Sequence, residues 1–321
     1  MKLNIVKNLI LVCLIFSAMP LFAIELSDCL VIEDEKTRLN CYDDLAQQEN
    51  TTPSDASAAG EPSMVETRLE QESLVSFTEF AITPHKPNYF LPVTYNDRPN
   101  EEYFDEGNLQ RTEVKFQLSF KIPLTRDLLV KDSQLWFAYS QLAFWQMYNT
   151  DSSSPFRETN YEPELIWAFH TNNEVMGMRN TLIALSLNHQ SNGLSDPSSR
   201  SWNRVIVDFL LEKDNYVLSF RPWYRIPSRE ENDNNPDIHE YLGYAEFAGL
   251  IKQNEHLTTV MLRNNLRSED NRTTIEANYT FRFSKRLKGI AQYFNGYGES
   301  LIDYNHRSHR LGIGILLTDW L

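Results

Sequence analysis

The chain has 321 residues, of which 41% are hydrophobic, and its formal net charge at pH 7 is −14. So acidic a chain has no basic surface for nucleic acid, which is therefore not an expected partner. No later segment approaches about 18 consecutive apolar residues, which excludes a bundle of transmembrane helices but leaves open a β-barrel, whose alternating strands dilute hydropathy.

Residues 1–23 have the pattern of a secretory signal peptide. Lys2 and Lys7 precede an apolar run over 9–16, and residues 18–23 follow, with the small residue Ala23 at the expected cleavage site. The run is too short to span a membrane. The mature protein is therefore expected to leave the cytoplasm.

Residues 24–48 form an acidic leader, predicted to be a short helical hairpin, and residues 49–76 form a disordered or loosely helical linker. Cys13 leaves with the signal peptide, so Cys29 and Cys41 remain as a pair in the leader. In an oxidising compartment such a pair is expected to form a disulfide. Two unpaired buried thiols are the alternative.

Residues 77–321 read as a series of strands separated by polar turns. In one of them, apolar residues such as Phe116 and Leu118 alternate with polar residues such as Lys115 and Gln117. A packed soluble sheet would not bury such lysines, so the two faces must meet different solvents. Apolar outside and polar inside is the pattern of a barrel in an outer membrane.

Eleven strands are predicted, at 111–123, 133–146, 159–171, 178–191, 202–212, 215–226, 239–252, 256–265, 272–283, 286–296 and 307–319. Single-chain bacterial barrels usually have an even number of strands, so a twelfth is predicted at 86–95. The expected fold is therefore all-β, a twelve-stranded antiparallel transmembrane β-barrel. Tryptophans near strand ends suit aromatic girdles, with ordinary packing as the alternative: Trp136, Trp145, Trp202, Trp223 and Trp320.

One predicted hairpin carries reactive side chains. On the strand 178–191, the apolar series of one face continues into His189 and Ser191. On the strand 202–212, Asn203 leads the apolar series. Because side chains alternate with period two along a strand, all three polar residues are expected on the outer, apolar face.

These three residue types can form a catalytic triad. His189 can act as general base on the Ser191 hydroxyl, and Asn203 can fix the tautomer of the imidazole. Gly193 lets the backbone approach an ester, so its N–H is a candidate oxyanion donor. The turn also offers hard oxygen ligands such as Asp196, which calcium prefers. Taken singly, each residue has the alternative of ordinary polarity in a turn.

The hairpin sequence NHQSNGLSDPSSRSWNR resembles the signature of the bacterial outer membrane phospholipase A family. The similarity covers the chain from about residue 77 to the end and includes SSPFRETNYEPEL, EVKFQLSFKIPL, RPWYRI, NPDIHEYLGY and GYGESLIDYN. The resemblance implies a twelve-stranded barrel that hydrolyses acyl esters of phospholipids and lysophospholipids. It implies that His189, Ser191 and Asn203 are catalytic and that Gly193 lies at the oxyanion hole.

The resemblance also implies a requirement for calcium and activation by formation of a homodimer. Carried onto this chain, the calcium ligands are the Ser199 hydroxyl, the Leu194 carbonyl and the carbonyl of the partner subunit's Ser153, with Asp196 at an alternative position. Leu194 replaces an arginine that is common in the family, a change that a carbonyl ligand tolerates. Gln141, in an outward apolar row, fits the family's polar contact between subunits.

Strand parity places the turn of the hairpin at the external surface, because both termini of such barrels are periplasmic. The expected location is the bacterial outer membrane, with the active site at the outer leaflet and membrane phospholipids as substrate. A non-catalytic channel or adhesin barrel is the alternative, and a secreted soluble lipase is a third possibility. The acidic leader and the terminal Trp320–Leu321, where many such barrels end in Phe, depart from the family.

Overall fold

The computed structural model describes residues 34, 36–39, 41–42, 63–75, 81–104, 109–128, 130–229, 233–284 and 287–319. The chain divides into two compact units, Met1–Glu61 and Pro62–Leu321. The strands of the described residues all belong to the second unit. The predicted signal peptide, residues 1–23, and Trp320 lie outside the described residues.

In the first unit, the described part of the leader is helical. Residues 36–39 form a helical turn, and the Asp34 carboxylate accepts a hydrogen bond from the Thr37 N–H at 2.8 Å. This contact satisfies a backbone donor at the start of the turn. Cys41 is disulfide-bonded. Its predicted partner, Cys29, lies outside the described residues.

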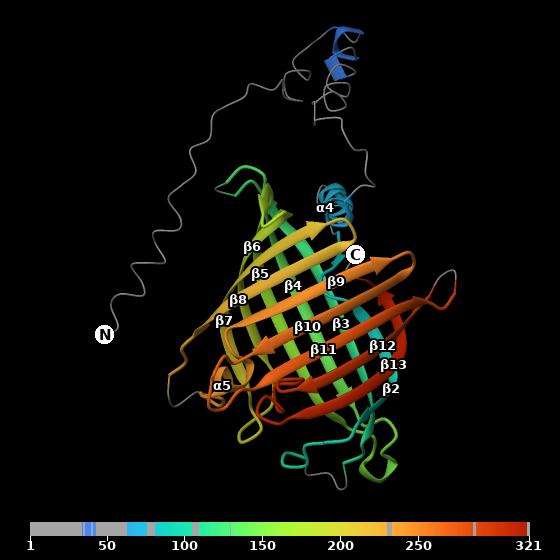
Figure 1. Ribbon diagram of the computed structural model, residues 1–321, viewed down its shortest axis with the longest axis vertical. Helices are drawn as coiled ribbons and strands as arrows, with labels where there is room; N and C mark the ends of the chain where they lie inside the picture. Colours follow the sequence, from blue (N-terminus) through green and yellow to red (C-terminus); the bar gives the residue numbers. More distant parts are fainter. Residues whose placement is uncertain are drawn as a thin grey trace. The chain divides into compact units, whose positions relative to one another are not determined.

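The second unit is a closed antiparallel barrel of 12 strands, β2 to β13 (Figure 1). Their bounds are β2 Asn88–Asn96, β3 Thr112–Arg126, β4 Ser133–Trp145, β5 Phe156–Val175, β6 Met178–Ser191, β7 Ser201–Lys213, β8 Tyr216–Ile226, β9 Ala245–Gln253, β10 His256–Asn264, β11 Thr273–Arg282, β12 Lys288–Gly296 and β13 Ser308–Thr318. Each strand pairs with the next along the chain, and β13 pairs with β2, which closes the ring. A two-residue strand, β1 (Thr83–Pro84), pairs with β3.

Burial alternates along the strands as the sequence pattern predicts. On β6, Ala184 is 5% exposed inside the barrel, whereas Leu185 and Leu187 are 40% and 54% exposed on the outer wall. On β3, Lys115 is 1% exposed and Leu118 is 48% exposed. Because neighbouring side chains point to opposite faces of a strand, the outer wall is apolar and the lumen is polar.

Most of the predicted strands are confirmed, and one requires correction. The prediction 178–191 coincides with β6, and the inferred twelfth strand, 86–95, is present as β2. The prediction 239–252 is wrong in its first part, where the chain forms helix α5 (Ile238–Leu242) and the strand begins only at Ala245. The first and last residues of α5 are both buried, because a spacing of four places them on one helical face.

The predicted linker 49–76 contains helix α4 (Met64–Val75), which belongs to the same compact unit as the barrel. The Glu212 carboxylate on β7 accepts hydrogen bonds from the Ser63 hydroxyl and, at 3.3 Å, from the Val65 N–H. These contacts satisfy donors at the start of the helix. Val65 packs in an apolar cluster with residues of β7 to β10, namely Leu210, Val217, Leu250 and Leu257. Within the described part of the chain, no helix is long and apolar enough to cross a membrane.

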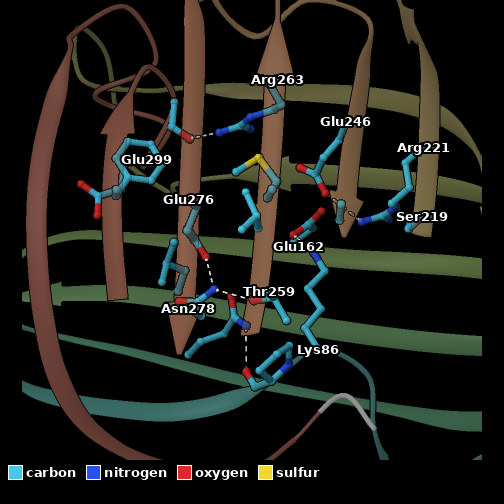
Figure 2. A pocket seen from close by; sticks show the side chains of 18 of the residues that line it. Lys86, Glu162, Ser219, Arg221, Glu246, Thr259, Arg263, Glu276, Asn278 and Glu299 are labelled. Carbon is cyan, nitrogen blue, oxygen red and sulfur yellow. Dashed lines mark hydrogen bonds and ion pairs between the residues drawn. The ribbon is translucent and has the colours of Figure 1, made fainter. Parts of the chain in front are cut away.

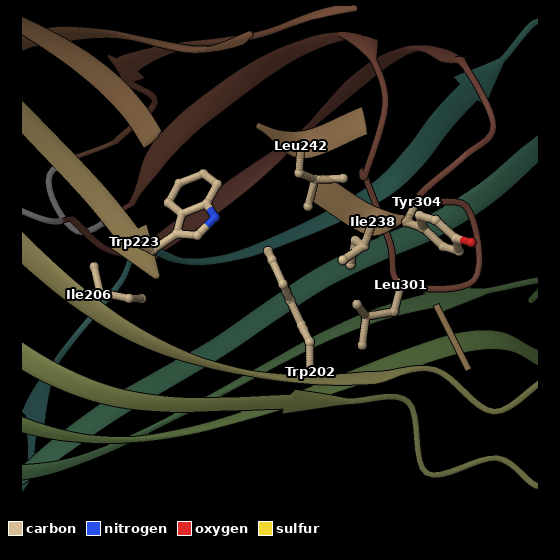
Figure 3. Close-up of a cluster of buried hydrophobic side chains, with 7 residues drawn as sticks. All are labelled: Trp202, Ile206, Trp223, Ile238, Leu242, Leu301 and Tyr304. Carbon is tan, nitrogen blue, oxygen red and sulfur yellow. The ribbon is translucent and has the colours of Figure 1, made fainter. Parts of the chain in front are cut away.

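A second apolar cluster lies at the other end of these strands (Figure 3). Its members are Trp202, Ile206, Trp223, Ile238, Leu242, Leu301 and Tyr304. Trp136, Trp202 and Trp223 are 2%, 1% and 8% exposed, so their predicted place in an aromatic girdle is wrong and the alternative of ordinary packing holds. Trp145 instead stacks on Phe156, with ring centroids 5.3 Å apart.

A cavity of about 380 Å³ occupies the lumen, and members of both clusters line it together with charged side chains (Figure 2). Lys86 pairs with Glu162 at 2.5 Å. Lys115 and Arg310 both pair with Glu299, at 3.0 and 2.8 Å. An isolated charge would be costly here, so the paired lumenal charges stabilise one another.

Candidate active site on the outer wall

The candidate site lies where β6 ends and β7 begins. The antiparallel register pairs His189 with Asn203 and Ser191 with Ser201. His189 and Ser191 follow Leu187 at intervals of two residues, and Leu187 is exposed on the outer wall. The hairpin therefore brings His189, Ser191 and Asn203 to one end of its outer face, where each side chain is partly buried.

The imidazole of His189 is held by Asn203. Its Nδ1 lies 2.8 Å from Oδ1 of Asn203. Because an amide oxygen only accepts, Nδ1 carries a proton and donates the hydrogen bond, so Nε2 is the ring nitrogen that could accept a proton. Among the hydrogen bonds of the described residues, none joins the Ser191 hydroxyl to His189. The candidate base and its candidate orienting group are thus in contact, with the candidate nucleophile two residues further along the same strand face.

The turn between the two strands is organised by Asn192, which is 4% exposed. Its Oδ1 accepts hydrogen bonds from the Arg200 N–H at 2.9 Å and the Leu194 N–H at 3.4 Å. Its Nδ2 donates to the Ser198 carbonyl at 2.8 Å. The Arg200 guanidinium donates to the Ser199 carbonyl at 2.6 Å. One side chain therefore joins the beginning of the turn to its end.

Gly193, the predicted oxyanion donor, has a backbone that favours glycine. Its φ is +68°, and a Cβ at this position would lie 3.2 Å from the ring of Tyr161. A larger residue would therefore be strained and crowded. The glycine places a backbone N–H two residues after Ser191 with no side chain to obstruct an approaching ester.

Three of the predicted calcium ligands share this turn. Leu194 is 46% exposed, Ser199 is partly buried, and the exposed Asp196 accepts a hydrogen bond from Asn234 at 3.0 Å. Ser153 belongs to the separate loop between β4 and β5, where its φ is 58°. One chain thus brings together Leu194, Asp196 and Ser199 but keeps Ser153 in another loop.

The donor set fits calcium in chemical type. Hydroxyl, carbonyl and carboxylate oxygens are hard ligands of the kind that calcium prefers. Among the described residues, no group of three or more His, Cys, Asp and Glu side chains could hold a metal. A calcium ion here would therefore depend on the mixed oxygens of Leu194, Asp196 and Ser199 and on further ligands.

Gln141, the predicted subunit contact, is partly buried on β4. Its register partner on β5 is Tyr161, and Tyr161 is in turn the register partner of Ser191 on β6. Neighbouring strands lie about 4.8 Å apart, so Gln141 and Ser191 share a row with backbones about 10 Å apart. The Tyr139 hydroxyl donates to Oε1 of Gln141 at 3.4 Å.

Sequence reasoning missed the side chains that support the hairpin from the lumen. Trp202 Nε1 donates to Gln190 Oε1 at 2.8 Å, and Asn192 is buried. A signal for them was available, since even-numbered residues of this strand point to the lumen, where polar side chains find partners. The partner of Trp202 was not available from alternation alone, because it depends on the register of β6 with β7, in which Gln190 lies opposite Trp202.

The fold and the site together define a class of protein, a closed antiparallel barrel whose apolar outer wall bears a serine, a histidine and an asparagine on one hairpin. A family model described as Phospholipase A1 matches residues 65–317. The chain belongs to the phospholipase A1 family.

Individual relatives are similar over most of their length. The phospholipase A1 of Salmonella typhimurium is 38% identical over 247 residues, which are 75% of this chain and 82% of the relative. That of Escherichia coli is 37% identical over the same shares. The solved outer membrane phospholipase A from Escherichia coli has a TM-score of 0.70 at 34% identity, covering 76% of this chain and 94% of the other. The Salmonella typhi outer membrane phospholipase, a dimer with bound calcium, has a TM-score of 0.71 at 36% identity, covering 77% and 96%.

Proposed function

We propose that this chain is a calcium-dependent outer membrane phospholipase A that hydrolyses acyl esters of phospholipids and lysophospholipids and is activated by dimerisation. The observation that carries the proposal is the hydrogen bond between His189 and Asn203 on the apolar outer wall, with Ser191 on the same strand face. Membership of the phospholipase A1 family supports this class of reaction.

In the proposed reaction, Nε2 of His189 takes the proton of the Ser191 hydroxyl as its oxygen attacks the ester carbonyl. The Gly193 N–H donates a hydrogen bond to the oxyanion that forms. His189 then gives the proton to the leaving alcohol. Water, activated in the same way, attacks the acyl-enzyme, releases the fatty acid and restores Ser191. Throughout, Asn203 holds the tautomer of the imidazole.

Calcium would be held by the Ser199 hydroxyl, the Leu194 carbonyl and the carbonyl of the partner subunit's Ser153, with Asp196 at an alternative position. When bound, the ion supplies positive charge that stabilises the oxyanion. One chain offers only part of this ligand set, so metal binding and dimerisation support each other. The calcium-bound dimer of the Salmonella typhi relative supports this proposal.

The proposed location is the bacterial outer membrane, with the site at the outer leaflet. The lengths of the connections support this orientation. At the end opposite the site, β5, β7 and β9 connect to the following strands through 176–177, 214–215 and 254–255, whereas β6 and β7 are joined by 192–200. Outer membrane barrels have short periplasmic turns and longer external loops.

Fatty acid release from phospholipid dispersed in detergent tests the proposal against a non-catalytic channel or adhesin barrel. We expect release with calcium and none after addition of a chelator. Ser191→Ala should lose turnover because the nucleophile is removed, while its heat-modifiable gel migration, the sign of a folded barrel, stays intact. Ser186→Ala, on the same strand but facing the lumen, is the matched control. A folded wild type without calcium-dependent release, or an active Ser191→Ala, would exclude the proposed function.

A further inference from the structure

Asn192 has one further contact, directed into the barrel. Its Nδ2 lies 3.4 Å from Oε2 of Glu158 on β5, and Glu158 is 2% exposed. The other oxygen of that carboxylate, Oε1, accepts hydrogen bonds from Asn160 at 2.6 Å and from the Ile302 N–H at 3.1 Å. The two oxygens of one buried carboxylate therefore contact two different loops, the turn of the hairpin and the loop after β12.

The loop after β12, which contacts this carboxylate, is itself held by an ion pair, a hydrogen bond and apolar packing. Its Asp303 pairs with Arg157 at 2.8 Å and accepts a hydrogen bond from the Ser300 hydroxyl at 2.7 Å. Burial alone raises the pKa of the Asp303 carboxyl, but the Arg157 guanidinium and the hydrogen bonds from Ser300 and Asn100 together outweigh it, so the net pKa is lowered. Leu301, which is 2% exposed, packs in the apolar cluster of Figure 3.

We propose that Asn192 and Glu158 are positioning residues for the reaction at Ser191. The carboxylate holds the Asn192 amide from inside the barrel, and the amide holds the turn that carries the Gly193 N–H and the predicted ligand Leu194. The inference rests on the proposed function, since it concerns the geometry of the same site. Neither side chain reaches the outer wall, so both act through the backbone of the turn.

The chemistry of the amide explains why this position needs asparagine. Its oxygen accepts hydrogen bonds from the N–H groups of Leu194 and Arg200. Its nitrogen donates to the Ser198 carbonyl and to the Glu158 carboxylate. Alanine would leave all four groups without this partner, and aspartate would place a second carboxylate beside Glu158. Oxyanion donors act through preorganisation, and a displacement of about 1 Å can reduce the rate about 100-fold.

The test is a set of variants of the full chain, each assayed with saturating calcium on the same dispersed phospholipid. Asn192→Ala and Glu158→Ala should each lower kcat about 10-fold to 100-fold while KM stays within about twofold, because transition-state geometry is lost but lipid binding is not. The double variant should resemble Asn192→Ala alone, because Glu158 acts through Asn192. The matched control is Asn278→Ala, a lumenal asparagine on β11 that donates to Glu276 at 3.0 Å, and its kcat should not change.

The contrary outcomes are distinct. Unchanged kcat in folded Asn192→Ala, additive losses in the double variant, or a rise in KM without a fall in kcat would overturn the positioning inference.

If Glu158→Ala fails to migrate as a folded barrel, Glu158→Gln replaces it. In that variant an oxygen can still face Asn160 and Ile302 while an NH₂ group opposes Asn192, so the same fall in kcat is expected. An active Ser191→Ala would overturn the proposed function. An inactive Ser191→Ala with a fully active Asn192→Ala would overturn only the positioning role.

Discussion

In the proposed triad, Asn203 occupies the position where other triads place a carboxylate. The solvent of the outer wall explains the difference. An ionised side chain that faces hydrocarbon carries a desolvation cost of several kcal/mol, which a neutral amide avoids. The amide still accepts from Nδ1 of His189 at 2.8 Å and so fixes the ring. Orientation is retained, and only part of the electrostatic stabilisation of the imidazolium is lost.

Replacement of Asn203 by alanine should therefore reduce kcat about 10-fold to 100-fold, less than the loss in Ser191→Ala, because the imidazole remains but is no longer oriented. Steady-state fatty acid release with saturating calcium measures the effect. Val205→Ala, the next residue on the same face of β7, is the control and should stay within about twofold of wild type. Equal rates for Asn203→Ala and wild type would contradict a role in orienting His189.

Helix α4 is attached to the barrel by charge as well as by apolar packing. Glu72, which is 7% exposed, pairs with Arg68 at 2.8 Å and with Lys121 of β3 at 2.6 Å. Burial alone raises the pKa of the Glu72 carboxyl, but Lys121 and Arg68 outweigh it and lower the net pKa. A lowered pKa in the folded state stabilises the fold above the ordinary pKa of a glutamate. This contribution disappears as the pH falls through the lowered pKa.

We therefore expect acid to weaken the attachment of α4. Hydrogen exchange of residues 64–75, corrected for intrinsic rates, should show protection at neutral pH that declines as Glu72 becomes protonated. Glu72→Gln should show lower protection than wild type even at neutral pH, and its protection should depend less on pH. Glu70→Gln, at an exposed site on the same helix, is the matched control. Identical pH profiles for Glu72→Gln and wild type would contradict the role of the ion pairs.

The whole molecule places its candidate site beside its candidate subunit contact. Gln141 lies in register with Tyr161, and Tyr161 lies in register with Ser191. Two strand spacings therefore separate the candidate subunit contact from the candidate nucleophile. An amide on a lipid-facing wall gains from a polar partner, which a second copy related by twofold symmetry can supply. A contact between copies at Gln141 would therefore bring the loop with the partner subunit's Ser153 near the turn that holds the predicted calcium ligands.

Replacement of Gln141 by alanine should weaken dimerisation by about 0.6 to 2 kcal/mol, or roughly 3-fold to 30-fold in the dimer dissociation constant. Chemical crosslinking across a range of protein-to-detergent ratios, with and without calcium, measures it. Thr258→Ala, an outward residue of β10 on the far side of the ring, is the control. Unchanged crosslinking in Gln141→Ala would place the subunit contact elsewhere.

The strands and their faces could be predicted from local patterns. The period-two alternation of β6 was enough to define its bounds and to place His189 and Ser191 on the apolar face. The same alternation on β7 placed Asn203 on that face, and the turn chemistry between the two strands predicted the hairpin that brings it beside them. These inferences succeed because lipid and lumen impose opposite requirements on adjacent residues, so the polarity of each residue indicates which face of the strand it occupies.

The partners inside the barrel depend on long-range geometry. Asn192 meets Glu158 across 34 positions of sequence, and Ile302 meets the same carboxylate across 144. The attachment of α4 to Glu212 and the packing of Trp202 in one cluster with Ile238 and Leu301 also depend on long-range geometry. Alternation tells which side chains point inward, but the shear and closure of the ring decide which of them meet. That is why the strand face of His189, Ser191 and Asn203 could be predicted from the sequence, whereas the lumenal contacts of Asn192 required the folded barrel.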